Sequence, residues 1–452
     1  MKKNYEINMC EGPLLPKLVL FALPLMLSSI LQLLYNAADV IVVGKFAGTT
    51  ALAAVSSTGS LTNLTINFFM GLSIGANVTV ARLLGAKDRE GASAAVHTSM
   101  LLAVLSGIFV AFVGFFGART FLTWMGSPAD VIDQATLYLK IYFLGVPASM
   151  VYNFGSSILR SIGDTKRPLI FLSISGILNV ILNLVLVICF HLDVAGVAIA
   201  TIFSQFVSAV FVVLFMMRAK GSAVFLDPKK LRFHKPQLLL ILRTGIPAGI
   251  QSSVFAISNV LIQSSINFFG STAMAGNGAS SNLEGFVYVA MNAFCQAAQT
   301  FTSQNLGAKK PDRIRHILID CLILVTAIGL GLGLILYFFG PQLIGIYDDN
   351  PEVAVYGMMR LSIIAFTYFT CGTMDTMCGQ MRGLGYSVIP TFVSLIGACG
   401  LRVLWIYTIF QKEHTLTCLY ISYPVSWILT TAAYFICYAI VIKKVRRRLT
   451  EA

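Results

Sequence analysis

Long apolar runs recur along the whole sequence of 452 residues, and they restrict what the chain can fold into. A helix needs about 20 mainly apolar residues to cross the hydrocarbon core of a bilayer. The strands of a membrane barrel would instead alternate in short segments. We therefore predict an all-α integral membrane protein with twelve transmembrane helices, near residues 17–43, 52–80, 94–117, 132–158, 168–190, 194–217, 238–268, 273–304, 315–339, 353–381, 387–410 and 415–442.

The composition supports a membrane protein. Only 11% of the residues are charged and 57% are hydrophobic, whereas soluble domains carry roughly 25% charged residues. The first apolar run continues far past the length of a signal peptide and has no small-residue cleavage site, so we predict no cleavable signal. The nine cysteines show neither a pairing pattern nor metal spacing, and we predict no cofactor.

The net charge of +13 is distributed as a topology signal. Cytoplasmic loops of membrane proteins are enriched in lysine and arginine, and an even number of spans puts both termini on one side. That side would be cytoplasmic and would also hold the long polar loop 218–237. This distribution argues against nucleic-acid binding. Most basic residues fall in segments that would share this side, at 2–17, 82–89, 160–167, 218–243, 309–315 and 443–448.

Two halves of the chain resemble each other. The segment LLGAK at 83–87 recurs as NLGAK at 305–309, and RSIG at 160–163 recurs as RGLG at 382–385. Internal repeats are typical of secondary transporters. We therefore predict two six-helix bundles related by a repeat. The predicted parts are an amino-terminal bundle, a cytoplasmic linker, a carboxy-terminal bundle and a basic cytoplasmic tail, at 1–217, 218–237, 238–442 and 443–452.

Four sequence features together resemble the multidrug and toxic compound extrusion (MATE) transporters. They are Asp39-x-x-x-x-Gly44 at the end of a Pro-containing helix, the paired LLGAK and NLGAK segments, the segment from Arg160 to Pro168, and DVAGVAIAT at 193–201. The resemblance is closest to the prokaryotic branch of DNA-damage-inducible-type proteins. It implies two bundles arranged in a V that export cationic or amphipathic small molecules, driven by inward flow of H⁺ or Na⁺. We accordingly expect a monomer in the cytoplasmic membrane of a bacterium.

The resemblance also implies a cation-coupling site in the first bundle, matched here by Asp39, Asn179, Asn183 and Thr201. The branch commonly has aspartate where this chain has Asn183. That difference leaves Asp39 as the single carboxylate, and it leaves open whether a proton or Na⁺ is coupled.

The residues themselves support this site. A charge at the centre of a bilayer is costly, so an acid there usually has a role. Asn179 and Asn183 are four residues apart and share a helix face, and hard cations prefer oxygen ligands. A shift by 222 or 223 residues takes these positions to side chains without these polar groups in the second half, whereas a cluster needed only for packing would be expected twice. The alternative is a structural hydrogen-bonded core, especially for the amides and the hydroxyl.

The second half has its own intramembrane acids, Glu284 and Asp375. Either can bind a cationic substrate or a proton, or can instead pair with a nearby arginine such as Arg382. Arg360, in the outer part of its helix, is expected to snorkel to the interface. Aromatic and methionine side chains that could line a cargo site, each of which alone favours core or lipid contact, are Phe68, Phe69, Met70, Tyr288, Met291 and Phe294.

Other functions find less support in the sequence. No Walker motif is present and no histidine joins a metal-ligand spacing, so we do not expect an enzyme. A channel would call for a repeated polar ring, whereas the polar groups differ between the halves. A flippase of lipid-linked saccharides or other amphiphiles is the closest alternative. It would line its cavity with cationic residues, which here gather at the predicted cytoplasmic edge. The sequence therefore favours cation-coupled antiport by alternating access.

Overall fold

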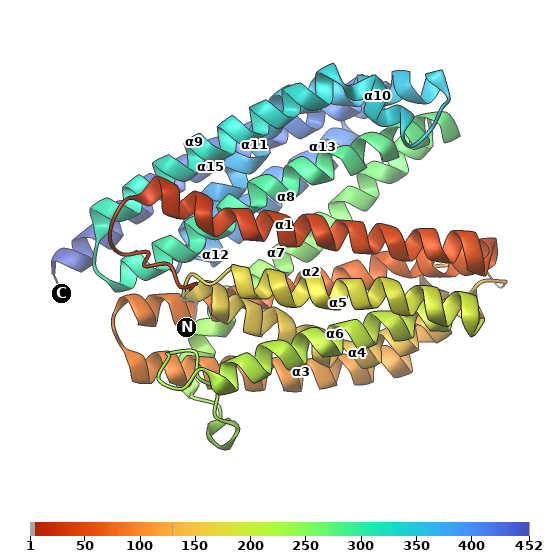
Figure 1. The fold of residues 1–452 in the computed structure, drawn as a ribbon. Helices are drawn as coiled ribbons and strands as arrows, with labels where there is room; N and C mark the ends of the chain where they lie inside the picture. The colour runs from red at the N-terminus through yellow and green to blue at the C-terminus, as the bar shows by residue number, and fades with distance from the viewer. Residues whose placement is uncertain (1–4, 129, 452) are drawn as a thin grey trace. The chain divides into compact units, whose positions relative to one another are not determined.

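The computed structural model describes residues 5–128 and 130–451, and helices dominate it (Figure 1). In the first half the long elements are α1 (Leu14–Val42) continued by the π-helix η1 (Val43–Ala47), α2 (Thr49–Gly85), α3 (Arg89–Trp124), α4 (Ile132–Ser161), α5 (Lys166–Leu184) continued by η2 (Val185–Cys189), and α6 (Asp193–Arg218). In the second half they are α7 (Lys235–Asn267), α8 (Ser271–Gly307), α9 (Pro311–Phe338), α11 (Pro351–Gly383), the broken series α12 (Val388–Ser394), η4 (Leu395–Gly400), α13 (Leu401–Tyr407) and α14 (Ile409–Lys412), and α15 (Leu416–Thr450). The short elements are η3 (Pro228–Lys230) and α10 (Gly340–Gly345).

The prediction of an all-α membrane protein is confirmed. Within the described part of the chain, nine helices are long and apolar enough to span a membrane, and α11 joins them as a pair of segments bent by 51°. The two remaining long helices, α4 and α8, are less apolar because polar and charged residues interrupt them. These twelve long helical stretches correspond to the twelve apolar runs of the sequence.

The chain divides into two compact units. The first unit contains the N-terminal residues up to Asn8 together with Leu27–Leu242, and the second contains Met9–Met26 together with the residues from Arg243 onward. Helix α1 therefore contributes its first residues to the second unit and the stretch with Asp39 to the first. The sequence-based limits 1–217 and 238–442 stay a prediction. They assign residues 9–26 to the amino-terminal bundle, whereas the second compact unit contains these residues.

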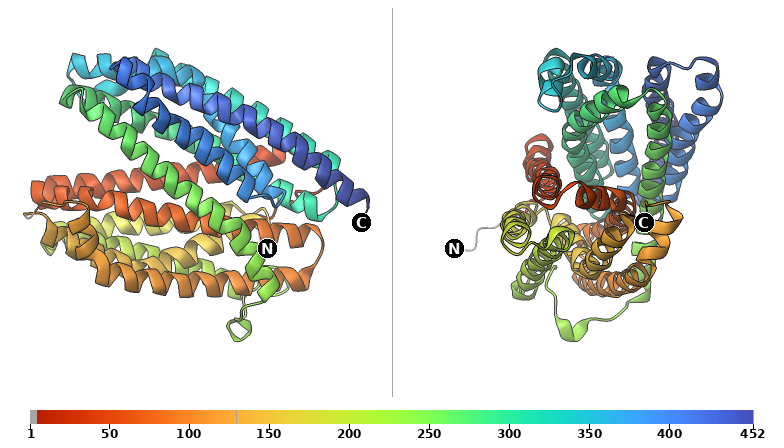
Figure 2. Two further views of the ribbon diagram at one scale, coloured as in Figure 1. Left: turned by 180° about the vertical axis from the view of Figure 1, so that it is seen from behind. Right: turned by 90° about the vertical axis from the view of Figure 1, so that its right-hand side faces the viewer.

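Each unit is organised around one helix. In the first unit α4 contacts α2, α3 and α6, and in the second α11 contacts α8, α9 and α15. Within each unit these helices run side by side in all views (Figures 1 and 2). Helices α4 and α11 occupy matching places in the two repeats. The repeat is therefore visible in the packing as well as in the sequence.

The backbone repeats the same special turns in both halves. Lys87 and Lys309 both adopt positive φ, 59° and 55°, at the ends of the LLGAK and NLGAK segments. Left-handed backbone is uncommon for residues other than glycine, so its recurrence at matching positions is specific. Gly163 and Gly385, a second pair of matching positions, also adopt positive φ, 85° and 86°. The repeated sequence motifs therefore encode repeated turns that end the membrane helices.

Candidate functional site

The structure brings Asp39 of α1 and the amides of α5 into contact within the first unit. Asn183 Nδ2 donates a hydrogen bond to Asp39 Oδ1. The same nitrogen lies 3.3 Å from Asn179 Oδ1. Asn179 and Asn183 are buried, and Asp39 is partly exposed. A carboxylate in a membrane-spanning helix is therefore held by a buried amide of a neighbouring helix.

Thr201 of α6 completes this group, which we call the Asp39 cluster: Asp39, Asn179, Asn183 and Thr201. The Thr201 hydroxyl lies near the Asp39 carboxylate. It also makes a 2.9 Å hydrogen bond to the carbonyl oxygen of Val197. A hydroxyl oxygen that donates to a carbonyl keeps lone pairs that can face a cation. All four residues that the sequence pointed to thus meet at one place.

Local packing explains why α1 and α5 approach there. The ring of Tyr35, one turn before Asp39, lies against Gly176 where a side chain would otherwise stand. The Tyr35 hydroxyl donates to the carbonyl oxygen of Ser173 at 3.3 Å. Four residues after Asp39 and two residues after Asn183, helices α1 and α5 continue as the π-helical turns η1 and η2, which contact each other. Such turns are frequent at functional sites.

One buried oxygen of the cluster has no partner. Asn183 Oδ1 is enclosed and makes no hydrogen bond with the described residues. A buried orphan of this kind is usually explained by a water or an ion. No group of three or more His, Cys, Asp or Glu suited to a metal ion occurs in residues 5–128 and 130–451. The cluster therefore offers one carboxylate with neutral oxygens, a donor set suited to Na⁺ or a proton rather than to a transition metal.

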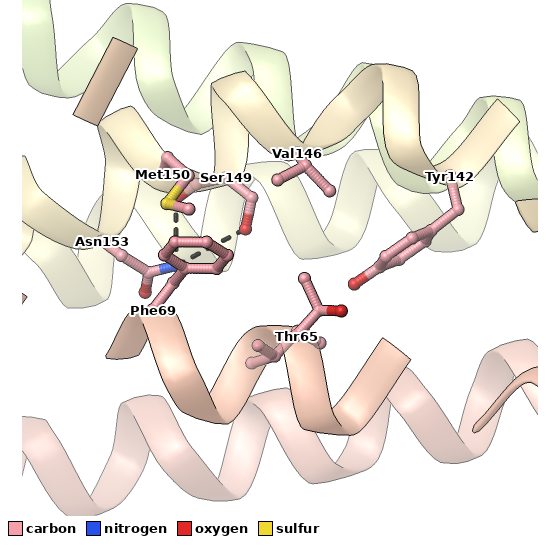
Figure 3. Close-up of a pocket in the computed structure, with 8 residues that line it drawn as sticks. Thr65, Phe69, Tyr142, Val146, Ser149, Met150 and Asn153 are labelled. Carbon is pink, nitrogen blue, oxygen red and sulfur yellow. Dashed lines mark hydrogen bonds between the residues drawn. The ribbon is translucent and has the colours of Figure 1, made fainter. Parts of the chain in front are cut away.

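A small pocket lies in the same unit between α2 and α4 (Figure 3). Its cavity volume is about 10 Å³, which is room for about one water molecule. Asn153 Nδ2 donates to the carbonyl oxygen of Ser149 at 2.9 Å, and the Tyr142 hydroxyl points into the pocket. The wall is mixed apolar, aromatic and polar, formed by Thr65, Ile66, Phe69, Tyr142, Val146, Ser149, Met150 and Asn153.

Tyr138 links this pocket to Asp39, and sequence reasoning missed it. The Tyr138 ring stacks on Tyr142 with centroids 6.1 Å apart, and it lies within electrostatic reach of Asp39. Of the aromatic and methionine candidates proposed from the sequence, Phe69 lines the pocket, whereas Met291 and Phe294 are core residues of the second unit. The spacing of Tyr138 and Tyr142, one turn apart on one helix face, was the signal that could have found the pair.

In the second unit Glu284 of α8 forms a buried ion pair with Arg360 of α11. Arg360 Nε and Nη2 lie 2.8 and 2.6 Å from the two Glu284 oxygens, and Arg360 Nη1 lies 2.8 Å from Asn277 Oδ1. The prediction that Arg360 snorkels to the interface is wrong, because only 5% of the residue is exposed. The bidentate carboxylate explains how α11 keeps an arginine inside the bundle. The predicted binding role of Glu284 stays a prediction, and Arg360 occupies both of its oxygens in this conformation.

Asp375 has different neighbours. The Tyr288 side chain lies near its carboxylate, and Arg382 and Arg402 lie within electrostatic reach. Arg382 pairs with an amide instead, donating from Nη2 to Gln251 Oε1 at 2.8 Å. The structure therefore does not join Glu284 and Asp375 in one acidic pair. The role of Asp375 also stays a prediction.

Comparison with known proteins identifies the family. The sequence profile of the MatE family matches residues 24–185 and again residues 247–408. The chain belongs to the MatE family. Members of this family are membrane transporters, so the protein is a multi-pass transporter and not an enzyme. The two matches are displaced by 223 residues, which confirms the internal repeat found in the sequence and in the turns.

Several known proteins resemble most or all of the chain. The probable multidrug resistance protein YoeA of Bacillus subtilis is 28% identical, with 85% of this MATE chain and 84% of YoeA covered. The multidrug export protein MepA of Staphylococcus saprophyticus is 24% identical over 89% of this chain and 92% of MepA. A solved structure of a MOP superfamily transporter from Pyrococcus furiosus covers 99% of this chain and 100% of its own, with a TM-score of 0.91 and 20% identity. At this level of identity, the similarity to the Pyrococcus furiosus structure shows that the two proteins share a fold.

Proposed function

We propose that this MATE protein exports cationic and amphipathic small molecules across a bacterial cytoplasmic membrane by antiport with H⁺ or Na⁺. The observation that carries the proposal is the Asp39 cluster, a carboxylate at membrane depth held by the amide of Asn183 beside an unpartnered amide oxygen. The names of the relatives YoeA and MepA support drug-like cargo. Both termini are cytoplasmic in this proposal, and the transporter works as a monomer.

Asp39 has the central role in the mechanism. Its charged form attracts a proton or Na⁺ from outside, and Asn179, Asn183 and Thr201 supply the neutral oxygens. Neutralising the carboxylate weakens the hydrogen bond that it accepts from the Asn183 amide, and the contact between α1 and α5 changes. Tyr138 lies within electrostatic reach of Asp39 and stacks on the pocket residue Tyr142. In this proposal ion binding at Asp39 therefore alters the packing around the pocket and lowers the affinity of the transporter for outward-exposed cargo.

Everted membrane vesicles test this function. Inside-out vesicles are supplied with a fluorescent cation such as ethidium, and uptake is followed under a pH gradient alone and under a Na⁺ gradient alone. We expect uptake with one of the gradients and a loss of at least about tenfold in Asp39→Asn, because coupling in the first unit depends on this carboxylate. Asp133→Asn is the matched control, since Asp133 is 77% exposed and pairs with Arg119. Equal uptake by Asp39→Asn and the native protein under both gradients would refute the coupling role.

One observation favours a second candidate function, a flippase of lipid-linked saccharides or similar amphiphiles. The sequence argument against it was that basic residues gather at the cytoplasmic edge. The second unit nevertheless buries Arg360, Arg382 and Arg402, and arginines suit phosphate groups. Scrambling of a fluorescent phospholipid in proteoliposomes, compared with cation export by the same preparation, separates the two functions.

A further inference from the structure

Arg402 is a buried cation of the second unit without a carboxylate partner. It lies in α13, and 3% of the residue is exposed. None of the ion pairs in the described part of the chain includes it. A buried charge without an opposite charge is unfavourable. Binding of an anion next to Arg402 would therefore stabilise this buried guanidinium.

The contacts of Arg402 leave most of its donors available. Its Nε donates to Ser426 Oγ at 2.9 Å. Its Cζ lies 4.4 Å from the centroid of the Tyr423 ring and 5.5 Å from that of Trp427. A guanidinium has five N–H donors, and contacts with ring faces use none of them. Within the residues that the structure describes, the Ser426 bond is the one hydrogen bond that Arg402 makes.

The surrounding charges do not balance Arg402. Arg360 lies over the same Tyr423 ring, with its Cζ 5.1 Å from the centroid. Both oxygens of Glu284 are already bound by Arg360. Asp375 is within electrostatic reach of Arg402 but forms no ion pair with it in the described structure. Two guanidiniums thus lie over one tyrosine ring, and the only carboxylate bound by either of them in the described residues is Glu284, which pairs with Arg360.

The internal repeat adds an independent argument. An offset of 222 residues, as in the repeated turns, takes Asn179 of the Asp39 cluster to Leu401, and the offset of 223 between the two family matches takes it to the next residue, Arg402. The same two offsets take Thr201 to Tyr423 and to Pro424. At corresponding places of the same fold, the first unit offers a carboxylate and amide oxygens, and the second offers a guanidinium beside two aromatic rings. The two repeats are therefore specialised for groups of opposite charge.

We propose that Arg402 binds an anionic group, a carboxylate or a phosphate, of the exported compound. Ser426 fixes the guanidinium through Nε, and the remaining N–H groups bind the anion edge-on, as in bidentate arginine–carboxylate and arginine–phosphate pairs. Tyr423 and Trp427 contact the flat or apolar body next to that group. This proposal rests on the export function proposed above, and it extends the cargo from cations to zwitterionic amphiphiles.

A pair of dyes that differ in one carboxylate tests the proposal. Tetramethylrhodamine carries a free carboxylate, and its methyl ester does not. Equilibrium binding of each dye to the purified protein in phosphatidylcholine nanodiscs is measured by fluorescence anisotropy. We expect Arg402→Gln to weaken binding of the acid by at least about tenfold and to leave the ester within about twofold. Arg402→Lys keeps the charge but loses the paired N–H donors of the guanidinium, so its affinity for the acid should lie between those of the native protein and Arg402→Gln.

The controls separate this role from folding and from coupling. Arg119→Gln removes an exposed arginine that is 65% accessible and should leave both affinities unchanged. Ester binding reports that each variant is folded. Asp39→Asn should retain the preference for the acid, because no ion gradient is present in the assay. Failure of coupling at Asp39 therefore leaves this test intact.

A second arm identifies the source of the anion. In nanodiscs that contain phosphatidylglycerol, competition with the acid dye in the native protein but not in Arg402→Gln would assign the site to a lipid phosphate as well. No competition, together with selective loss of the acid dye in Arg402→Gln, would assign it to the carboxylate of soluble cargo. Equal losses of acid and ester, or no loss of either, would overturn the proposal.

Discussion

At the scale of single residues, the chain treats its intramembrane acids in two ways. Asp39 accepts from a buried amide, whereas Glu284 is neutralised by a bidentate arginine. The position and rarity of Asp39 made it predictable from the sequence. The Glu284–Arg360 pair was not, because residues 76 apart in sequence meet only through the packing of α8 on α11. Sequence reasoning could see each charge but not its partner.

The Glu284–Arg360 pair should be strongly coupled in stability. Replacing one member, as in Glu284→Leu or Arg360→Met, leaves the other buried and uncompensated, which costs roughly 3–5 kcal/mol. We expect the double variant to recover most of that loss, because neither charge then remains. The free energy of unfolding in mixed detergent micelles measures the cycle. The exposed pair Arg119–Asp133 is the control, with effects of about 0–1 kcal/mol. Additive losses in the double variant would show that the pair is not coupled.

At the scale of helices, small residues decide which side chains meet. A Cβ on Gly276 of α8 would lie 2.7 Å from the carbonyl oxygen of Val353 and 2.8 Å from the nitrogen of Gly357. Ser280, one turn later, donates to the Gly357 carbonyl at 2.9 Å. One further turn along α8 stands Glu284, opposite Arg360. Close backbone approach is a known use of small residues between membrane helices, and here it places the ion pair.

Two glycines of α8 should therefore respond oppositely to the same substitution. Gly276→Ala forces α8 away from α11 and should lower the unfolding midpoint, with Glu284–Arg360 weakened. A Cβ on Gly278 meets nothing within 4 Å. Gly278→Ala should leave the midpoint unchanged or raise it, since alanine in a helix interior is favoured over glycine by about 0.5–1 kcal/mol. Thermal unfolding of both variants decides the matter, and a Gly276→Ala protein as stable as Gly278→Ala would contradict this account of the packing.

Helix irregularities were the least predictable feature of the elements. The π-helical turns η1 and η2 begin four residues after Asp39 and two after Asn183, yet VGKFA and VLVIC have no composition that distinguishes them from regular helix. The twelve helices were predictable because the apolar runs are long. The π-turns depend on how α1, α5 and α6 pack together, so only the structure reveals them.

At the scale of the whole molecule, one fold is used twice with different chemistry. The repeat was predictable because motifs such as LLGAK and NLGAK encode the same left-handed turn, at Lys87 and Lys309. The asymmetry was half predictable. The absence of the Asp39 cluster from the second repeat could be read from the sequence, whereas the importance of Arg402, near the position that corresponds to Asn179, could not. Its significance depends on burial and on the missing carboxylate, which are properties of the packed unit.

Asp39 is central to the proposed mechanism because it couples the movement of the ion to the transport of cargo. Ion release driven by cargo tests this coupling most directly. Proteoliposomes are loaded with ²²Na⁺ or with a pH-sensitive dye, and a cationic cargo is added on the side where it binds. For the native protein we predict release of one of the two ions in proportion to cargo entry. Asp39→Asn should bind cargo but release no ion above the Asp133→Asn control. Ion release by Asp39→Asn equal to that of the native protein would contradict the account.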